Sequence, residues 1–363
     1  MHQGRMKLGK RMSHDEIAAR PRLMRGHLTK LDHSSMTKPP KYRVVNQLQH
    51  DADDERSRLI AGLRAAKASV EPKYFYDPLG CALYAAICHL DEYYLTRTEE
   101  AIFQRHRQAI ADAVMAGRSR GAATGGTLID LGAGDCHKAQ SWLPYLKPQR
   151  YLAVDIAAPG IEAALDKFAA DFPEVEMLGL ATDFATTLSI PADLLAGPRT
   201  MFYPGSSIGN FAPDAAIRFL AEMRAIVGDS GGCLLIGVDA KKSKARLDAA
   251  YDDALGVTAA FNLNVLRHLN RVLGSSFDCV DWRHAGFYNA DAGRVEMHLE
   301  AIRAVEVNLD GVSRHFAAGE RIHSENSYKY HRAEFEALLG AAGFTETLCW
   351  TDNEEAYWVF CAR

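Results

Sequence analysis

The sequence lacks the features that mark a metal centre, a secreted disulfide framework, a membrane span or a nucleic-acid surface. Its seven cysteines are scattered over 363 residues, and none forms a CxxC pair. Lys and Arg total 42 against 46 Asp and Glu, so the net charge of −4 provides no chain-wide basic field. No apolar run reaches the roughly 18 residues that a membrane helix needs. These absences predict a cytoplasmic protein that holds no metal and binds neither nucleic acid nor a membrane; we expect it to be a monomer.

The first 41 residues differ from the rest of the chain, because they carry ten Lys or Arg against three acids and few large apolar side chains. We expect residues 1–41 to be a disordered leader. The alternative is a targeting or anion-binding arm. A secretory signal is excluded, because no apolar central stretch follows the charges.

The pattern of apolar residues predicts an α/β fold. Residues 54–117 repeat apolar side chains at helical spacing of three and four. From Thr127, short apolar runs alternate with helical stretches, which is typical of a parallel, doubly wound sheet covered on both faces. The runs are TLIDLGAG, RYLAVDIA, VEMLGLATD, RTMFYPGSS and GGCLLIGVD.

This alternation stops after Asp239. The next segment predicts one or two helices, followed by strand-like alternation in RVEMHLEAIRAVEVNL with a turn at LDGV. An amphipathic helix ending at Gly343 and two closing strands then return to the α/β pattern. We therefore predict a Rossmann-like domain of residues 42–239 plus 331–363, interrupted by a substrate-binding lobe at 240–330.

A turn containing Gly132 and Gly134 follows the first of these strands. Glycines let the backbone approach a ligand closely, but His137 stands where the dinucleotide fingerprint needs a third glycine. Asp155 ends the next strand, where a carboxylate can accept both ribose hydroxyls of an adenosine.

Asp183 and Phe184 follow the third strand, where they could bind and stack on an adenine. Each acid alone could instead be a helix N-cap. Their order at successive strand ends favours an adenosine-bearing cofactor that lacks a pyrophosphate. S-adenosylmethionine is such a cofactor.

With these residues placed, residues 73–363 resemble the histidine-specific Nα-methyltransferases that make hercynine for ergothioneine. The resemblance rests on the order of several segments: KYFYDPLGCALYAAICHLDEYYLTRTEEAI, DLGAGDCHKAQ, FYPGSSIGNF, AYDDALGVTAAFNLNVL, EMHL and IHSENSYKY. It implies a class I S-adenosylmethionine-dependent methyltransferase fold with an inserted substrate-binding lobe. No family counterpart of residues 1–41 is evident.

The same resemblance implies roles for individual residues. The cofactor would be held by Gly132, Lys138, Asp155, Asp183 and Phe184, together with the second glycine of the turn, Gly134. The substrate's backbone groups would be held by Tyr76, Asn210 and Tyr251, and Tyr93 would lie near the reacting amine, which makes Tyr93 and Asn210 the predicted catalytic pair. The imidazole would be held by Glu325 and Ser327, with Met297 packing on it.

The chemistry of methyl transfer is compatible with these residue types. An amine attacks a sulfonium methyl only through its neutral lone pair, so the protein mainly has to position it. Tyr and Asn can do this without stabilising the ammonium form, whereas a neighbouring carboxylate would raise the amine pKa. Glu325 and Ser327 lie two residues apart, so on a strand they face the same side. The alternative for Glu325 is a surface salt bridge with Lys329 or Arg321.

We therefore predict an enzyme that trimethylates the α-amine of L-histidine, through its mono- and dimethyl forms, to hercynine. One alternative is an Nα-methyltransferase of another amino acid, such as tryptophan or tyrosine. Another is a cofactor-binding protein without catalysis.

Overall fold

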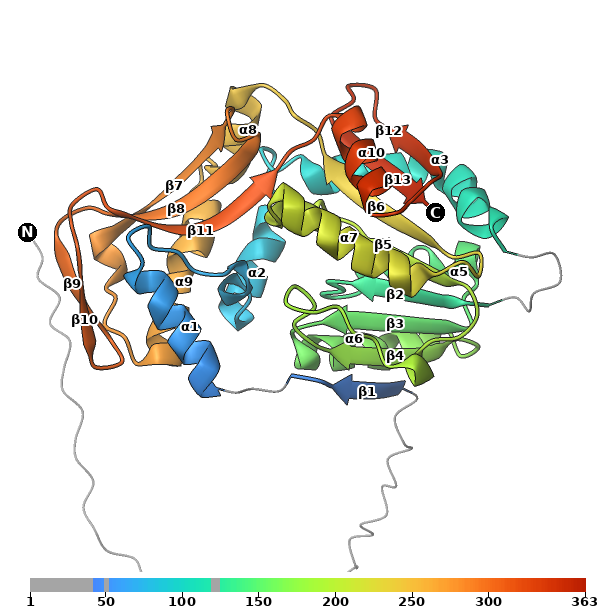
Figure 1. Cartoon of the computed structure of the whole chain (residues 1–363), viewed down its shortest axis with the longest axis horizontal. Helices are drawn as coiled ribbons and strands as arrows, with labels where there is room; N and C mark the ends of the chain where they lie inside the picture. Colours follow the sequence, from blue (N-terminus) through green and yellow to red (C-terminus); the bar gives the residue numbers. More distant parts are fainter. Residues whose placement is uncertain (1–41, 49–51, 119–124) are drawn as a thin grey trace, which may run out of the picture. The chain divides into compact units, whose positions relative to one another are not determined.

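The computed structural model describes residues 42–48, 52–118 and 125–363 (Figure 1). The predicted leader, residues 1–41, lies outside the described residues. The described residues fall within one compact unit.

The largest element is a sheet of eight strands in the order β1-β4-β3-β2-β5-β6-β13-β12. Strands β1 to β6 run parallel, and β13 is antiparallel to both β6 and β12. The bounds are β1 (Tyr42–Asn46), β2 (Thr127–Leu131), β3 (Arg150–Asp155), β4 (Glu176–Ala181), β5 (Arg199–Tyr203), β6 (Cys233–Asp239), β12 (Thr347–Thr351) and β13 (Tyr357–Ala362).

Helices cover both faces of this sheet, which is why β2, β6 and β13 are buried at every position. One face packs against α3 (Leu95–Ala116), α5 (Leu143–Leu146) and α6 (Ala158–Asp171), and the other against α7 (Pro213–Val227) and α10 (Arg332–Ala341). The strand order reverses between β2 and β5, and ligands of such sheets bind at the carboxyl ends of the strands beside that reversal. The predicted doubly wound α/β fold is confirmed.

A separate three-stranded antiparallel sheet, in the order β11-β8-β7, lies between β6 and α10 in the sequence. Its strands are β7 (Trp282–Asn289), β8 (Arg294–Ala301) and β11 (Arg321–Tyr328), and α8 (Lys244–Tyr251) and α9 (Val257–Leu273) precede them. A hairpin of β9 (Val305–Leu309) and β10 (Val312–Phe316) turns at Asp310 and Gly311, whose φ angles are 56° and 84°. The turn predicted at LDGV is therefore confirmed, whereas β7 was not predicted.

The elements between β1 and α3 contact α9, the last two by packing against it and the first through Arg56, whose guanidinium donates to the Val272 carbonyl oxygen (Figure 1). They are α1 (Ala52–Arg64), the 3-10 turn η1 (Pro72–Phe75) and α2 (Pro78–Ile87). The rings of Phe75 and Phe261 stack with centroids 4.5 Å apart, and the Asn264 amide donates to Asp77 at 2.7 Å. The segment 240–330 thus shares its hydrophobic core with residues that precede β2 in the sequence. Its bounds as a separate substrate-binding lobe remain a prediction.

One strand of the large sheet and the character of the helices remain to be described. The edge strand β1, which pairs in parallel with β4, was not predicted. Among the described helices, none combines the length and apolar character needed to span a bilayer.

Candidate active site

The glycine turn follows β2 and is tied to the end of β3. Gly132 and Gly134 have φ angles of 67° and 55°, in the left-handed region that favours glycine. The Gly134 N–H donates to Asp155 at 2.9 Å, and the Ala157 N–H donates to the other carboxylate oxygen at 3.0 Å. A Cβ placed on Gly134 would meet no atom within 4 Å, so the turn borders open space.

Asp183 and Phe184 lie beside this turn, just after β4. The tip of the Phe184 ring is 3.7 Å from the point that a Gly132 Cβ would occupy. Asp183 accepts a hydrogen bond from Lys73 at 3.3 Å, and β4 pairs with β3 so that Asp155 lies opposite Ala181. The structure therefore brings the predicted glycines, acids and aromatic ring together at one edge of the sheet.

Lys138, in the short helix α4 (His137–Gln140), reaches a buried carboxylate. Its ammonium lies 2.7 Å from Glu99, which also accepts from the Gly205 N–H and the Tyr357 hydroxyl at 2.7 Å each. The Glu99 side chain is 1% exposed and that of Lys138 is 37% exposed. The buried Glu99 carboxylate therefore fixes the position of the Lys138 ammonium.

All seven predicted substrate residues line one pocket of about 50 Å³. A neighbouring cavity of about 300 Å³ shares Asn210 and Glu325 with it. The seven come from segments far apart in sequence, and their convergence is a property of the fold: Tyr76, Tyr93, Asn210, Tyr251, Met297, Glu325 and Ser327.

Glu325 and Met297 face each other across strands β11 and β8. Within the described part of the chain, the Glu325 carboxylate makes no hydrogen bond, and burial raises its pKa to about 7 despite the nearby Lys329 ammonium. The predicted salt-bridge alternatives do not form, because Arg321 pairs with Glu300 at 2.7 Å and Lys329 with Asp239 at 2.8 Å. An unpaired carboxylate facing a pocket is a group that a ligand can satisfy.

Tyr93 and Tyr94 have different surroundings, as adjacent residues at the start of α3 can. Tyr93 lines the pocket, whereas the Tyr94 hydroxyl donates to Asp239 at 2.8 Å. Burial raises the pKa of Tyr76 and Tyr93 well above the ordinary tyrosine value. Both hydroxyls are therefore neutral at physiological pH.

Five aromatic rings surround the pocket in a continuous chain of contacts. Tyr84 lies edge-on to Tyr76 and Tyr93, with ring centroids 6.0 and 6.4 Å away. Tyr93 meets Tyr251 at 6.1 Å, and Phe261 lies 6.1 Å from Tyr76. Among the described residues lining this pocket, Glu325 is the one acidic side chain.

The loop after β5 carries Asn210 in the 3-10 turn η3 (Ser207–Asn210). Ser206 has a φ of 61°, and its hydroxyl accepts from the Asp239 N–H at 2.9 Å. A Cβ on Gly209 would come within 2.7 Å of the Tyr328 carbonyl oxygen, so this loop presses directly on β11. That close approach holds Asn210 between the two cavities.

Sequence reasoning missed several residues at this site. Tyr84 and Phe261 complete the aromatic wall, but in the sequence they look like ordinary core positions. Asp239 ends an apolar parallel strand, as Asp155 does, and this position in the sequence could have indicated a residue near the site. Lys329 continues the alternation of Glu325 and Ser327, so the two-residue period of a strand places it on the same face.

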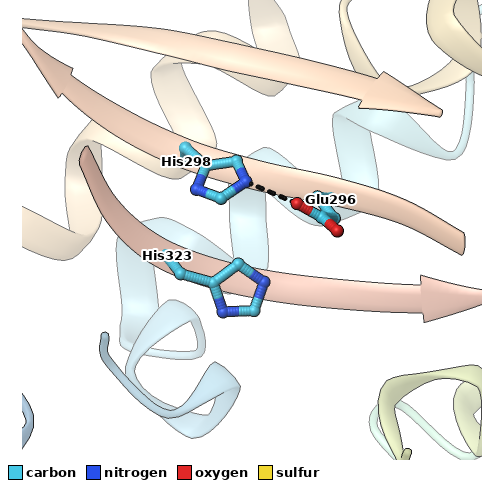
Figure 2. Close-up of side chains that lie close together, drawn as sticks. All are labelled: Glu296, His298 and His323. Carbon is cyan, nitrogen blue, oxygen red and sulfur yellow. Dashed lines mark hydrogen bonds and ion pairs between the residues drawn. The ribbon is translucent and has the colours of Figure 1, made fainter. Parts of the chain in front are cut away.

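A polar cluster lies elsewhere on the same small sheet (Figure 2). Glu296, His298 and His323 bring donor atoms within 4.8 Å of one another, a spacing compatible with metal coordination. The His298 ring lies 2.9 Å from Glu296, whose other oxygen is held by Arg294 at 2.9 Å. Because that guanidinium would repel a divalent cation, we assign no metal here, and the absence of a metal site stays a prediction.

Residues 55–363 match a family described as histidine-specific methyltransferase, SAM-dependent. A histidine N-alpha-methyltransferase of Mycolicibacterium smegmatis is 36% identical over 319 residues, covering 85% of this chain and 95% of that protein. Ergothioneine biosynthesis protein 1 of Neurospora crassa is 31% identical over 77% of this chain, which spans 31% of that protein. The N-methyltransferase imqF of Aspergillus flavus is 27% identical over 90% of this chain and 91% of its own length.

Proposed function

This chain belongs to the family of histidine-specific, S-adenosylmethionine-dependent methyltransferases, and from that premise we propose that it trimethylates the α-amine of L-histidine to hercynine, in ergothioneine biosynthesis. The observation that carries the proposal is the pocket in which seven separate residues of the predicted substrate site meet.

The residues around the glycine turn fit an adenosine-bearing methyl donor. Asp155 is fixed by two backbone N–H groups, and its remaining lone pairs can accept ribose hydroxyls. Phe184 beside Gly132 offers a stacking surface for the adenine, and Asp183 can accept its amino group. Bound here, S-adenosylmethionine supplies a methyl group already activated by a sulfonium.

The reacting amine would be held by neutral groups. Tyr76, Asn210 and Tyr251 would bind the backbone groups of the amino acid, with Tyr93 beside the amine. Glu325 is the one carboxylate among the described residues lining the pocket, and in this proposal it binds the imidazole, so no carboxylate is assigned to the amine, where it would stabilise the unreactive ammonium form. Tyr93 and Asn210 would thus act by orienting the lone pair, and positioning of this kind is worth several kcal/mol, up to about 7–11.

Repeated methylation makes a further demand, because the nitrogen ends as a quaternary cation. Aromatic rings attract a methylated ammonium without needing a hydrogen bond from it, and Tyr76, Tyr84, Tyr93 and Phe261 all line the pocket. The aromatic wall therefore suits the mono- and dimethyl intermediates as well as histidine.

The imidazole would bind between Glu325 and Ser327, with Met297 packed against it. Glu325 would accept one ring N–H, and that contact would satisfy a carboxylate that is otherwise unpaired. A side chain without ring nitrogens would leave this carboxylate desolvated, and such mismatches can cost up to about 10⁴-fold in specificity.

The test is a time course with purified protein, S-adenosylmethionine and L-histidine, followed by mass spectrometry. We expect the mono-, di- and trimethyl products to appear in that order. The absence of any N-methylated histidine would refute the proposal.

The second candidate is an Nα-methyltransferase of another amino acid, such as tryptophan or tyrosine. It is favoured by the match to an N-methyltransferase of Aspergillus flavus over most of both chains. A competition among the twenty amino acids distinguishes the two, and binding of the methyl donor without any product would indicate the non-catalytic alternative.

We further propose that the enzyme acts as a monomer in the cytoplasm, with residues 240–330 as its substrate-binding lobe. The seven cysteines are free thiols, which suits a reducing compartment. Tyr251, Met297, Glu325 and Ser327 all come from this segment. Light scattering and cell fractionation test the first two parts.

A further inference from the structure

Lys329 is a fully buried lysine directly behind the substrate pocket. It follows strand β11, and its side chain is 0% exposed, as is that of its partner Asp239. The ammonium lies 2.8 Å from Asp239, from the Tyr251 hydroxyl and from the Ser327 hydroxyl. Both hydroxyls belong to residues that line the pocket, whereas Lys329 does not line it.

The number of hydrogens in this network restricts how the hydroxyls are oriented. An ammonium has three N–H donors, and the three contacts of Lys329 use all of them. Tyr251 and Ser327 each accept one of these hydrogens. Their oxygens are also 2.9 Å apart, so one hydroxyl donates to the other. One O–H of the pair is then left to donate elsewhere.

We propose that Lys329 is a positioning residue for substrate recognition: anchored on Asp239, it fixes the hydroxyls of Tyr251 and Ser327 so that this pair turns one O–H donor toward the bound amino acid. This inference rests on the proposed function, in which Ser327 contacts the imidazole. A neutral imidazole has one N–H and one nitrogen lone pair. Glu325 would take the N–H, and the free hydroxyl hydrogen would bind the lone pair.

Lys242 provides a matched control for Lys329. Its ammonium binds the same carboxylate, 2.6 Å from Asp239, and its side chain is 7% exposed. Its other hydrogen-bond partners are the carbonyl oxygens of Ala240 and Ala356. Replacing Lys242 therefore disturbs Asp239 without touching the hydroxyl pair.

The experiment measures ligand binding to the full chain by calorimetry in the presence of S-adenosylhomocysteine. Histidine is compared with 3-pyrrolylalanine, in which a CH replaces the acceptor nitrogen of the ring. We expect Lys329→Met to weaken histidine binding about 10-fold or more and to remove most of the preference over pyrrolylalanine. Lys242→Met should change both by less than about 3-fold, and neither variant should alter the affinity for S-adenosylhomocysteine by more than about 2-fold.

A double-mutant cycle adds a readout that general destabilisation would not produce. Because Lys329 acts through Ser327, the losses from Lys329→Met and Ser327→Ala should not add in the double variant. If Lys329→Met does not fold, Lys329→Gln, whose amide can still donate to Asp239, takes its place with the same expected outcomes.

Two results would overturn the inference: an effect of Lys329→Met no larger than that of Lys242→Met, or an unchanged preference for histidine over pyrrolylalanine. Both require that the unmodified protein binds histidine. If it does not, the proposed function itself has failed, so the two failures are distinguishable.

Discussion

Two buried carboxylates near the active site are bound by similar groups, but the lysines that bind them differ in whether they keep free N–H donors for a ligand. Glu99 receives the Tyr357 hydroxyl and the Lys138 ammonium, each at 2.7 Å. Asp239 receives the Tyr94 hydroxyl and the Lys329 ammonium, each at 2.8 Å. The side chain of Lys138 is 37% exposed, whereas that of Lys329 is 0% exposed.

This difference separates two uses of a lysine. Glu99 is the one hydrogen-bond acceptor of the Lys138 ammonium among the described residues, so that ammonium keeps donors for an anionic ligand. Lys329 has no donor to spare and influences the substrate only through Tyr251 and Ser327. We infer that the first lysine serves the carboxylate of the methyl donor directly and that the second orders the substrate site.

The largest expected effect comes from removing the carboxylates. Asp239→Asn leaves two buried lysines without their counter-charge and should lower the free energy of unfolding by about 3–5 kcal/mol. Glu99→Gln leaves a half-exposed lysine and should cost about 1–2 kcal/mol. Urea unfolding of both variants measures this, and equal losses would remove the distinction between the two sites.

A smaller effect concerns the cofactor. Lys138→Met should weaken binding of S-adenosylhomocysteine by about 10-fold while leaving histidine affinity within about 2-fold. That is the reverse of the pattern expected for Lys329→Met. Calorimetry with each ligand distinguishes them, and an equal loss of both ligands would argue against separate roles.

The unpaired Glu325 should also make stability depend on pH. Burial raises its pKa from 4.5 to about 7, so its contribution is most favourable below about pH 4.5 and is lost as the pH rises through 7. Glu325→Gln should therefore stabilise the ligand-free protein by about 1–2 kcal/mol at pH 8 and by little at pH 5. The same variant should lose histidine affinity; a stability difference independent of pH would contradict the partly buried, unpaired carboxylate.

The smallest effect is expected from the polar cluster of Figure 2, which takes no part in either lysine network. His298→Gln should change the kcat/KM for histidine by less than about 2-fold, and dialysis against EDTA should leave it unchanged. A large loss of activity on EDTA treatment that zinc restores would show that the cluster holds a functional metal.

Much of the large sheet could be predicted from the sequence, because its strands are buried on both faces and appear as continuous apolar runs. The order of Gly132, Asp155 and Asp183 at successive strand ends then predicts the edge at which we propose that the cofactor binds. The edge strand β1 was not predicted, because its short segment YRVVN has neither a long apolar run nor clear alternation of apolar and polar residues.

The site residues that could not be predicted from the sequence are those whose role depends on a partner far away in the chain. Lys329 in SYKYH and Glu99 in TRTEEAIF look like solvated charges, and only the fold brings Asp239 and Lys138 to them. Tyr84 has the same character, since an aromatic side chain on a helix is usually a core residue. Periodicity identifies which face a side chain occupies, but it does not identify the partner across that face.

The most direct measurement is a crystal structure of the protein with S-adenosylhomocysteine and L-histidine. We predict that the imidazole lies between Glu325 and Ser327, with ring nitrogens within about 3 Å of each, and that the α-amine lies beside Tyr93 and points at the sulfur. An imidazole that contacts neither Glu325 nor Ser327 would contradict this account of histidine recognition.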